Sequence, residues 1–189
     1  MKLPIVKYGH PVLRRKGARI EAFTSQVKEL IQNMFETMYG ERGVGLAAQQ
    51  VGHALQLTVI DVRGVTDRPS TLEVNGVEAD VASFMPLVLV NPEIKPFGEA
   101  VSGPEGCLSF PEIFGDINRA ERVEVSALDR EGKRIVFSCG GLLARAIQHE
   151  FDHLQGILFI DRMSKEHKAS LRDDLDAVQF ATKAALKTK

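Results

Sequence analysis

The chain has 189 residues, 44% apolar and 26% charged, which is typical of a globular protein with one hydrophobic core. A net charge of −1 argues against a nucleic-acid-binding protein, and the lack of any run of 18 apolar residues excludes an apolar transmembrane helix. The N-terminus lacks the apolar core of a signal peptide, and two cysteines are too few for a disulfide framework. We therefore expect a cytoplasmic protein whose thiols are free to bind a metal.

The first third of the chain predicts an irregular entry, one helix and one strand. Residues 1–22 contain two prolines and are expected to be extended. Thr24 or Ser25 can cap a helix that stops at Gly40. Apolar residues recur in it at spacings of three, four and seven, which predicts one buried face: Val27, Leu30, Ile31, Met34, Phe35 and Met38. Residues 55–62 are predicted to form a strand.

The middle of the chain predicts strands separated by turn signals. Residues 63–85 are mostly polar, with an Asn-Gly pair at 75–76 that indicates a hairpin turn. Residues 87–90 are expected to form a strand that Asn91-Pro92 stops, and residues 93–101 a further strand.

The segment after residue 101 predicts an irregular loop followed by a hairpin. Residues 103–109, rich in glycine, are expected to be a loop or a bulged edge. Residues 122–129 alternate as a half-buried strand does, and a turn at 130–133 leads to a second strand at 134–139.

The C-terminal third predicts two helices. Gly140-Gly141 breaks the chain before a helix over residues 142–154, which ends near Gly156. Ser164 can cap a final helix, whose buried face is marked by Leu171, Leu175 and Val178. Because helices do not regularly alternate with strands, we expect an α+β fold, one domain over residues 1–189. Short antiparallel strands would pack around a central helix, with helices near both termini.

His149 and His153 are four residues apart and, with Glu150, form the H-E-x-x-H pattern. On a helix these two imidazoles share one face and can bind one ion. Glu150 is then placed to accept a proton from a water on that ion. The short string also arises by chance, and a single helical histidine is usually structural, so a third ligand decides the interpretation.

Four positions come into question for the third ligand. In metzincin proteases it is a histidine at the position of Phe159, which cannot bind a metal. Glu166 or His167 would require the last helix to turn back toward the site. Cys107 lies among glycines that suit a tight metal loop, and two imidazoles with one thiolate suit Zn²⁺ or Fe²⁺. The alternative for Cys107 is a small buried apolar residue, which is also our expectation for Cys139.

Three segments together resemble the motifs of peptide deformylases. Residues 43–50 (GVGLAAQQ) match G-x-G-L-A-A-x-Q, residues 105–109 match E-G-C-L-S, and residues 148–156 match Q-H-E-x-D-H-L-x-G, in the family's order. The helical C-terminus resembles the type 1 branch, and residues 63–85 are longer than the minimal family pattern. The resemblance implies one divalent ion held by Cys107, His149 and His153, natively Fe²⁺, with Zn²⁺, Ni²⁺ or Co²⁺ able to replace it.

The resemblance also implies the reaction, which is removal of the N-formyl group from formyl-methionine of nascent polypeptides with release of formate. Glu150 would move the proton, and the Gln50 side chain and the Leu108 amide would stabilise the oxyanion. Asp152 is either an orienting group or a surface residue.

A substrate site can be outlined on the face of His149. Helical spacing places Leu142, Arg145 and Ala146 there, and Leu142 and Ala146 with Val44 form either a methionine pocket or core. We expect Arg145 at the rim. A peptide can add as a strand along the open backbone beside Gly43 and Gly45, while Glu105 and Gly106 border the cysteine loop.

Two alternatives to the deformylase hypothesis use the same residues. One is a zincin-type endopeptidase, which Phe159 and Cys107 disfavour. The other is a non-enzymatic relative that docks on ribosomes through its last helix, where Lys183, Lys187 and Lys189 can meet RNA phosphates. Weak ribosome association is also compatible with an active enzyme, and these lysines otherwise mark a solvated end. We expect neither membrane nor DNA as a partner.

Overall fold

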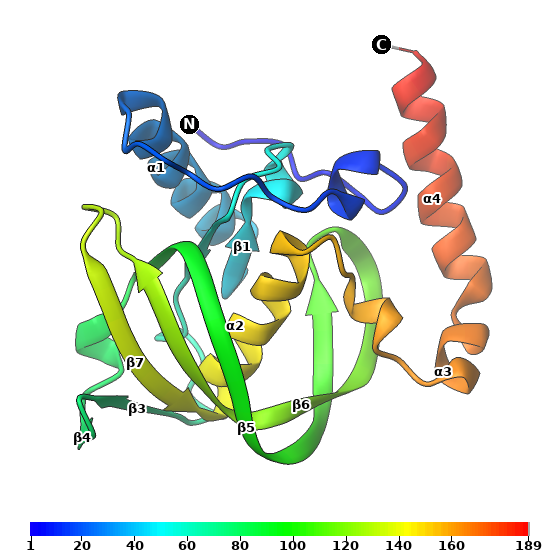
Figure 1. Cartoon of the computed structure of the whole chain (residues 1–189). Helices are drawn as coiled ribbons and strands as arrows, with labels where there is room; N and C mark the ends of the chain where they lie inside the picture. Colours follow the sequence, from blue (N-terminus) through cyan, green and yellow to red (C-terminus); the bar gives the residue numbers. More distant parts are fainter. Residues whose placement is uncertain (189) are drawn as a thin grey trace.

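Seven antiparallel strands form one sheet in the order β1-β2-β5-β6-β7-β3-β4. The computed structural model describes residues 1–188. Its strands are β1 (Gly45–Ala47), β2 (Leu57–Ile60), β3 (Ser70–Val74), β4 (Val77–Glu78), β5 (Leu87–Cys107), β6 (Phe110–Leu128) and β7 (Arg134–Gly140). The helices are α1 (Ser25–Gly40), α2 (Gly141–Leu154), α3 (Lys165–Ser170) and α4 (Arg172–Lys187). The predicted α+β class, with antiparallel strands around a central helix, is confirmed (Figure 1).

β5 and β6 form the longest hairpin of the sheet, and both strands extend beyond their predicted bounds. The strand predicted at residues 87–90 does not stop at Asn91-Pro92 but continues through residues 93–101 and on to Cys107. Asn91 has a φ of +50°, and the register shifts between Val90 and Glu93. Pro92, which has no N–H group to pair, therefore falls inside a bulge, where a strand tolerates it.

Asn91 also has a tertiary role that its turn-forming character hides. Its amide oxygen accepts a hydrogen bond from Ile20 N (2.9 Å), and its amide nitrogen donates to Ile20 O (2.8 Å). These contacts fix the N-terminal segment against the sheet, and that segment is not wholly extended, because Pro11–Arg14 form a 3₁₀ turn.

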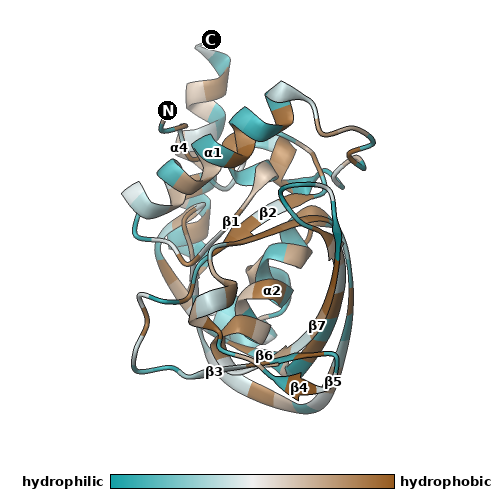
Figure 2. Cartoon of the chain, turned by 90° about the vertical axis from the view of Figure 1, so that its left-hand side faces the viewer, coloured by the Kyte–Doolittle hydropathy of each residue, from teal (hydrophilic) through white to brown (hydrophobic). Residues whose placement is uncertain are grey.

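β6 begins at Phe110, twelve residues before the predicted strand at 122–129. Two further register shifts, at Phe97/Ala100 and Gly106/Cys107, let the β5–β6 ribbon curve (Figures 1 and 2). The segment 103–109, predicted as a loop or a bulged edge, is the bulged end of β5 followed by a two-residue turn.

Helix α1 agrees with its prediction at both ends. The Thr24 hydroxyl accepts a hydrogen bond from Val27 N (3.3 Å), and the helix ends at Gly40. Five of the six predicted stripe residues are buried, and Val27 is half-buried. This face packs on β1 and β2 to form one of the three hydrophobic clusters of the protein.

The segment 63–85, predicted to be mostly polar with a hairpin turn, contains the paired strands β3 and β4. The Asn-Gly pair at 75–76 makes the predicted hairpin turn between β3 and β4, and both residues have positive φ. Just before this hairpin and at its first residue, the segment also caps the N-terminus of helix α2. Pro69 O accepts a hydrogen bond from Leu142 N (3.1 Å), and the Ser70 hydroxyl accepts one from Leu143 N (3.0 Å).

Gly141 makes this junction sterically feasible. A Cβ atom there would lie 2.1 Å from Pro69 O, and the residue has a φ of +67°. Helix α2 then runs through the middle of the molecule (Figures 1 and 2) and is buried along almost its whole length. It packs on β1, β2, β3, β5, β6 and β7, so its orientation is fixed from several sides.

The predicted final helix is divided in two at Leu171. Ser164 caps α3, as expected, but α4 is a separate helix that projects from the body (Figure 1). Of the predicted buried face only Leu175 is fully buried, while Leu171 and Val178 are half-buried. Among residues 1–188, no helix combines the length and apolar character needed to cross a membrane.

Candidate metal centre

The structure brings Cys107, at the end of β5, together with His149 and His153 of helix α2. One ligand atom from each lies within 4.8 Å of the others, and Cys107 Sγ is 3.3 Å from His153 Nε2. Both histidines are buried on one face of α2, with ring centroids 5.1 Å apart. A thiolate and two imidazoles are a suitable donor set for Zn²⁺ or Fe²⁺.

The cysteine reaches the helix because of the bulge at the end of β5. The register shift at Gly106/Cys107 comes directly before the turn formed by Leu108 and Ser109. Lys7 Nζ donates to Leu108 O (2.7 Å), and Tyr8 N donates to Ser109 O (2.9 Å). The turn is thereby fixed to the N-terminal segment, and the position of the thiol is fixed with it.

The amide of Gln50 has a defined orientation beside this turn. Its Oε1 accepts a hydrogen bond from Ala47 N (2.9 Å), which leaves Nε2 facing the cysteine loop, 3.4 Å from Cys107 Sγ and 3.4 Å from Ser109 Oγ. Gln50 is almost fully buried. A rigid N–H donor directed at the cluster is the arrangement that stabilises a developing oxyanion.

Glu150 is a buried carboxylic acid with one unsatisfied oxygen. Glu150 is 4% exposed, and its Oε2 has no hydrogen-bond partner within residues 1–188. Burial raises the pKa of Glu150 to about 7. A buried oxygen without a partner fits a water molecule held by an ion at the neighbouring ligands.

Gly45 leaves the space that Glu150 occupies. A Cβ atom at Gly45 would lie only 2.4 Å from Glu150 Oε1. Strand β1 therefore approaches the carboxylate more closely than any strand residue with a side chain could.

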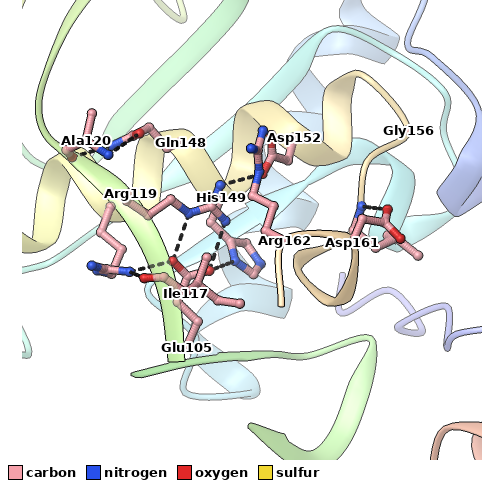
Figure 3. A network of polar contacts seen from close by, with 12 residues as sticks. Glu105, Ile117, Arg119, Ala120, Gln148, His149, Asp152, Gly156, Asp161 and Arg162 are labelled. Carbon is pink, nitrogen blue, oxygen red and sulfur yellow. Dashed lines mark hydrogen bonds and ion pairs between the residues drawn. The ribbon is translucent and has the colours of Figure 1, made fainter. Parts of the chain in front are cut away.

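Glu105 connects the ligand His149 to two buried arginines. Its Oε2 lies 2.8 Å from His149 Nδ1, so the other ring nitrogen remains for a metal. Both carboxylate oxygens also accept hydrogen bonds from Arg119 (2.9 Å each), and Oε1 accepts one from Arg145 (3.0 Å). Figure 3 shows this network.

The predicted place of Arg145 at the rim is wrong. The residue is buried, and besides Glu105 it donates to the carbonyl oxygens of Ile117 (2.8 Å) and Val101 (2.7 Å). A charged side chain is stable there because several acceptors surround it, which sequence spacing on the helix could not indicate.

The network continues to Asp152, whose role the sequence left open. Arg119 Nη1 donates to Asp152 Oδ2 (2.5 Å), and Arg162 donates to both Asp152 oxygens (2.5 and 2.6 Å). Gln148 binds the backbone of Ala120 through both ends of its amide (Figure 3). Asp152 is thus a buried orienting group and not a surface residue, and sequence reasoning missed Arg119 and Arg162 altogether.

The electrostatics of the cluster favour positive charge at His149. Burial alone would raise the pKa of Glu105, but the hydrogen bonds from Arg119 and His149 lower it far below its usual value. Burial alone would lower the pKa of His149, but its contacts with Cys107 and Glu105 raise it well above the ordinary value. Burial lowers the pKa of His153. The hydrogen-bond acceptors around His149 thus favour positive charge at this point of the cluster.

A cavity of about 640 Å³ opens beside the cluster. All the predicted substrate residues line it: Gly43, Val44, Gly45, Glu105, Gly106, Leu142, Arg145 and Ala146. Gln50, Cys107, Leu108, His149 and Glu150 also line it. Leu142 and Ala146 also belong to the hydrophobic core, so they both line the cavity and pack in the core.

The discarded ligand candidates lie elsewhere. Phe159 is buried, with its ring 6.0 Å from that of His149, and forms part of the wall beside the ligand. Glu166 and His167 are on α3 and do not belong to the group of residues able to hold a metal.

Comparisons with known proteins agree on one family. The sequence profile described as polypeptide deformylase matches residues 2–169. A peptide deformylase of Methylacidiphilum infernorum is 48% identical over 95% of this chain and 94% of its own length. One from Opitutus terrae is 44% identical over 99% and 98%. The crystal structure of a peptide deformylase from Legionella pneumophila, 38% identical, superposes with a TM-score of 0.78 and covers 94% of this chain and 95% of that one.

Proposed function

The chain belongs to the peptide deformylase family, and we propose that Cys107, His149 and His153 hold the ion of that family's reaction. The reaction is metal-dependent hydrolysis of the N-formyl group from nascent polypeptides, which releases formate. The observation that carries the residue assignment is the convergence of three ligand atoms within 4.8 Å, beside a buried carboxylate with an unpartnered oxygen.

When bound by Cys107, His149 and His153, a divalent ion would supply Lewis acidity for hydrolysis of the formyl group. Glu150 accepts the proton of the attacking water and delivers it to the leaving amine. Its position one residue after His149 on a buried helix keeps the carboxylate beside the ligands, and Gly45 leaves the space for it.

Gln50 Nε2 and the backbone N–H of Leu108 donate to the oxyanion that forms on the formyl group. The hydrogen bond from Ala47 N fixes the Gln50 amide, and the anchored turn fixes Leu108. Preorganised donors of this kind contribute about 10²–10³ in kcat each.

The substrate residues act through shape. The methionine side chain lies in the part of the cavity lined by Val44, Leu142 and Ala146. β1 is an edge strand of the sheet, so a peptide can add beside it as an extended strand that is recognised by its main chain.

Formate release tests the function directly. We expect protein prepared anaerobically to contain one divalent ion per chain, Fe²⁺ in its native form, and to release formate from formyl-methionyl peptides. Zn²⁺, Ni²⁺ or Co²⁺ should also occupy the site. Metal analysis and a formate assay of the same sample check both statements. If metal-loaded protein with intact ligands releases no formate, the assigned site is wrong; an internal peptide bond cleaved instead would favour the endopeptidase alternative.

We also propose weak association with ribosomes through α4. The helix projects from the body, and its far end carries Lys183 and Lys187, while Lys189 lies outside the described residues. Sedimentation of the full chain with ribosomes should decrease when both lysines are changed to glutamine. Unchanged sedimentation would exclude this contact.

We propose a cytoplasmic location, because a reducing compartment suits the free thiols of Cys107 and Cys139. Recovery of the protein from an oxidising compartment would contradict this location.

A further inference from the structure

Charged side chains surround the entrance of the cavity, and two of them, Arg42 and Arg68, have no part in the proposed chemistry. Lys7, Arg42 and Arg68 line the cavity together with Glu41 and Glu112. Arg42 is exposed, and Arg68 and Lys7 are half-buried. The buried network of Glu105 and Asp152 with Arg119, Arg145 and Arg162 contains no net negative charge, so it does not offset the cations at the entrance.

The balance at the entrance is positive. Glu41 forms an ion pair with Lys2 (2.6 Å), which offsets its charge. Lys7 donates to a carbonyl oxygen, which satisfies a hydrogen bond but leaves its charge. Within residues 1–188, neither Arg42 nor Arg68 has an ion-pair partner among the salt bridges of the structure. With Lys2, the entrance therefore carries four cations (Lys2, Lys7, Arg42 and Arg68) and two carboxylates (Glu41 and Glu112), although the whole chain carries a net charge of −1.

Arg68 has an anchored backbone. It directly precedes Pro69 and Ser70, the two residues that cap the N-terminus of α2. The residues that cap the N-terminus of α2 therefore also fix the backbone of Arg68, which lines the cavity. The same helix carries the ligands His149 and His153. This gives a role to a segment longer than the resemblance requires.

Arg42 also has a constrained backbone. Its φ is +56°, a conformation that favours glycine or asparagine after a helix. Hydrogen bonds from Arg42 N to Tyr39 O (3.1 Å) and from Gly43 N to Met38 O (2.9 Å) hold it there. The backbone at the end of α1 therefore fixes the position of Arg42 beside the cavity.

We propose that Arg42 and Arg68 are specificity-determining residues that favour formyl-methionyl chains with Asp or Glu at the two positions after methionine, over chains with Lys or Arg there. The inference rests on the proposed function, because the formyl group must lie at the metal for the next residues to pass the entrance. Exposed ion pairs each contribute modestly, so the effect is a preference and not an absolute requirement.

Matched peptides test the preference. Formyl-methionyl peptides of one length, with Asp, Asn or Lys at the second or third position, are compared with metal-loaded enzyme. We expect kcat/KM for Asp to exceed that for Lys about threefold to tenfold, mainly through KM, and the ratio to shrink at high salt. Arg42→Gln and Arg68→Gln should each lower the ratio, and the double variant should bring it close to one.

Arg134→Gln is the matched control, because Arg134 is an exposed arginine of β7 that does not line the cavity. It should leave the ratio unchanged. Equal rates for Asp, Asn and Lys peptides, or a preference for Lys, would overturn the inference while the deformylase activity stands. No formate from any peptide would instead contradict the proposed function.

Discussion

Replacing Glu150 by glutamine should lower kcat for deformylation by about 10²–10⁴-fold while the protein keeps its metal and its fold. The side chain is buried, and burial already disfavours its charged form, so the neutral isostere fits the same space without loss of stability. The three ligand atoms are untouched. Formate release by the variant, with metal content and thermal unfolding measured on the same sample, checks this expectation.

The control for Glu150 is Glu124→Gln, since Glu124 is an exposed glutamate of β6 away from the cavity. It should retain full activity. If Glu150→Gln stays as active as the Glu124 control, another group moves the proton. If it loses its metal, Glu150 acts on the site in a different way from the one assigned.

Replacing Arg119 by methionine should destabilise the protein by about 3 kcal/mol, the lower end of the 3–5 kcal/mol typical for breaking a buried ion pair. The Arg119 side chain is 3% exposed and pairs with both Glu105 and Asp152. The loss is limited because Arg145 still contacts Glu105 and Arg162 still contacts Asp152. Because Glu105 orients His149, metal affinity should also fall about 10–100-fold.

Arg122 provides a control on the same strand. Its ion pair with Glu73 (2.6 Å) is partly exposed, so Arg122→Met should cost about 0–1 kcal/mol and leave metal affinity unchanged. Urea denaturation of both variants, with a competitive metal titration, measures the two effects. Equal stability losses would mean that the buried network around Glu105 has no special weight. If Arg119→Met leaves the metal affinity unaltered, the network does not influence how His149 binds the metal.

Local patterns were sufficient for the parts of the site that lie on one helix. His149 and His153 share a face of α2 because four residues make about one turn, and this holds whatever surrounds the helix. Cys107 was chosen by chemistry and by the family resemblance, because no local pattern shows which helix a distant turn will meet.

Errors arose where tertiary contacts override local signals. Residues 110–121 contain charges and a glycine and did not suggest a strand, yet Ile113, Ile117 and Arg119 are buried in alternation. The inward arginine breaks the apolar pattern, and its partners Glu105 and Asp152 are 14 and 33 residues away. The position of Arg145 was predicted wrongly for the same reason, because the acceptors that surround its side chain come from β5 and β6.

The shortness of β1 bears on how the protein avoids aggregation. An exposed sheet edge can template pairing with another copy of the chain, and long flat edges are the most hazardous. β1 is three residues long, and the Ala47 N–H group is already occupied by Gln50. The opposite edge, β4, has only two residues. One extended peptide can pair beside β1, but β1 and β4 are too short to template a long ladder with another copy of the chain at these two ends of the sheet.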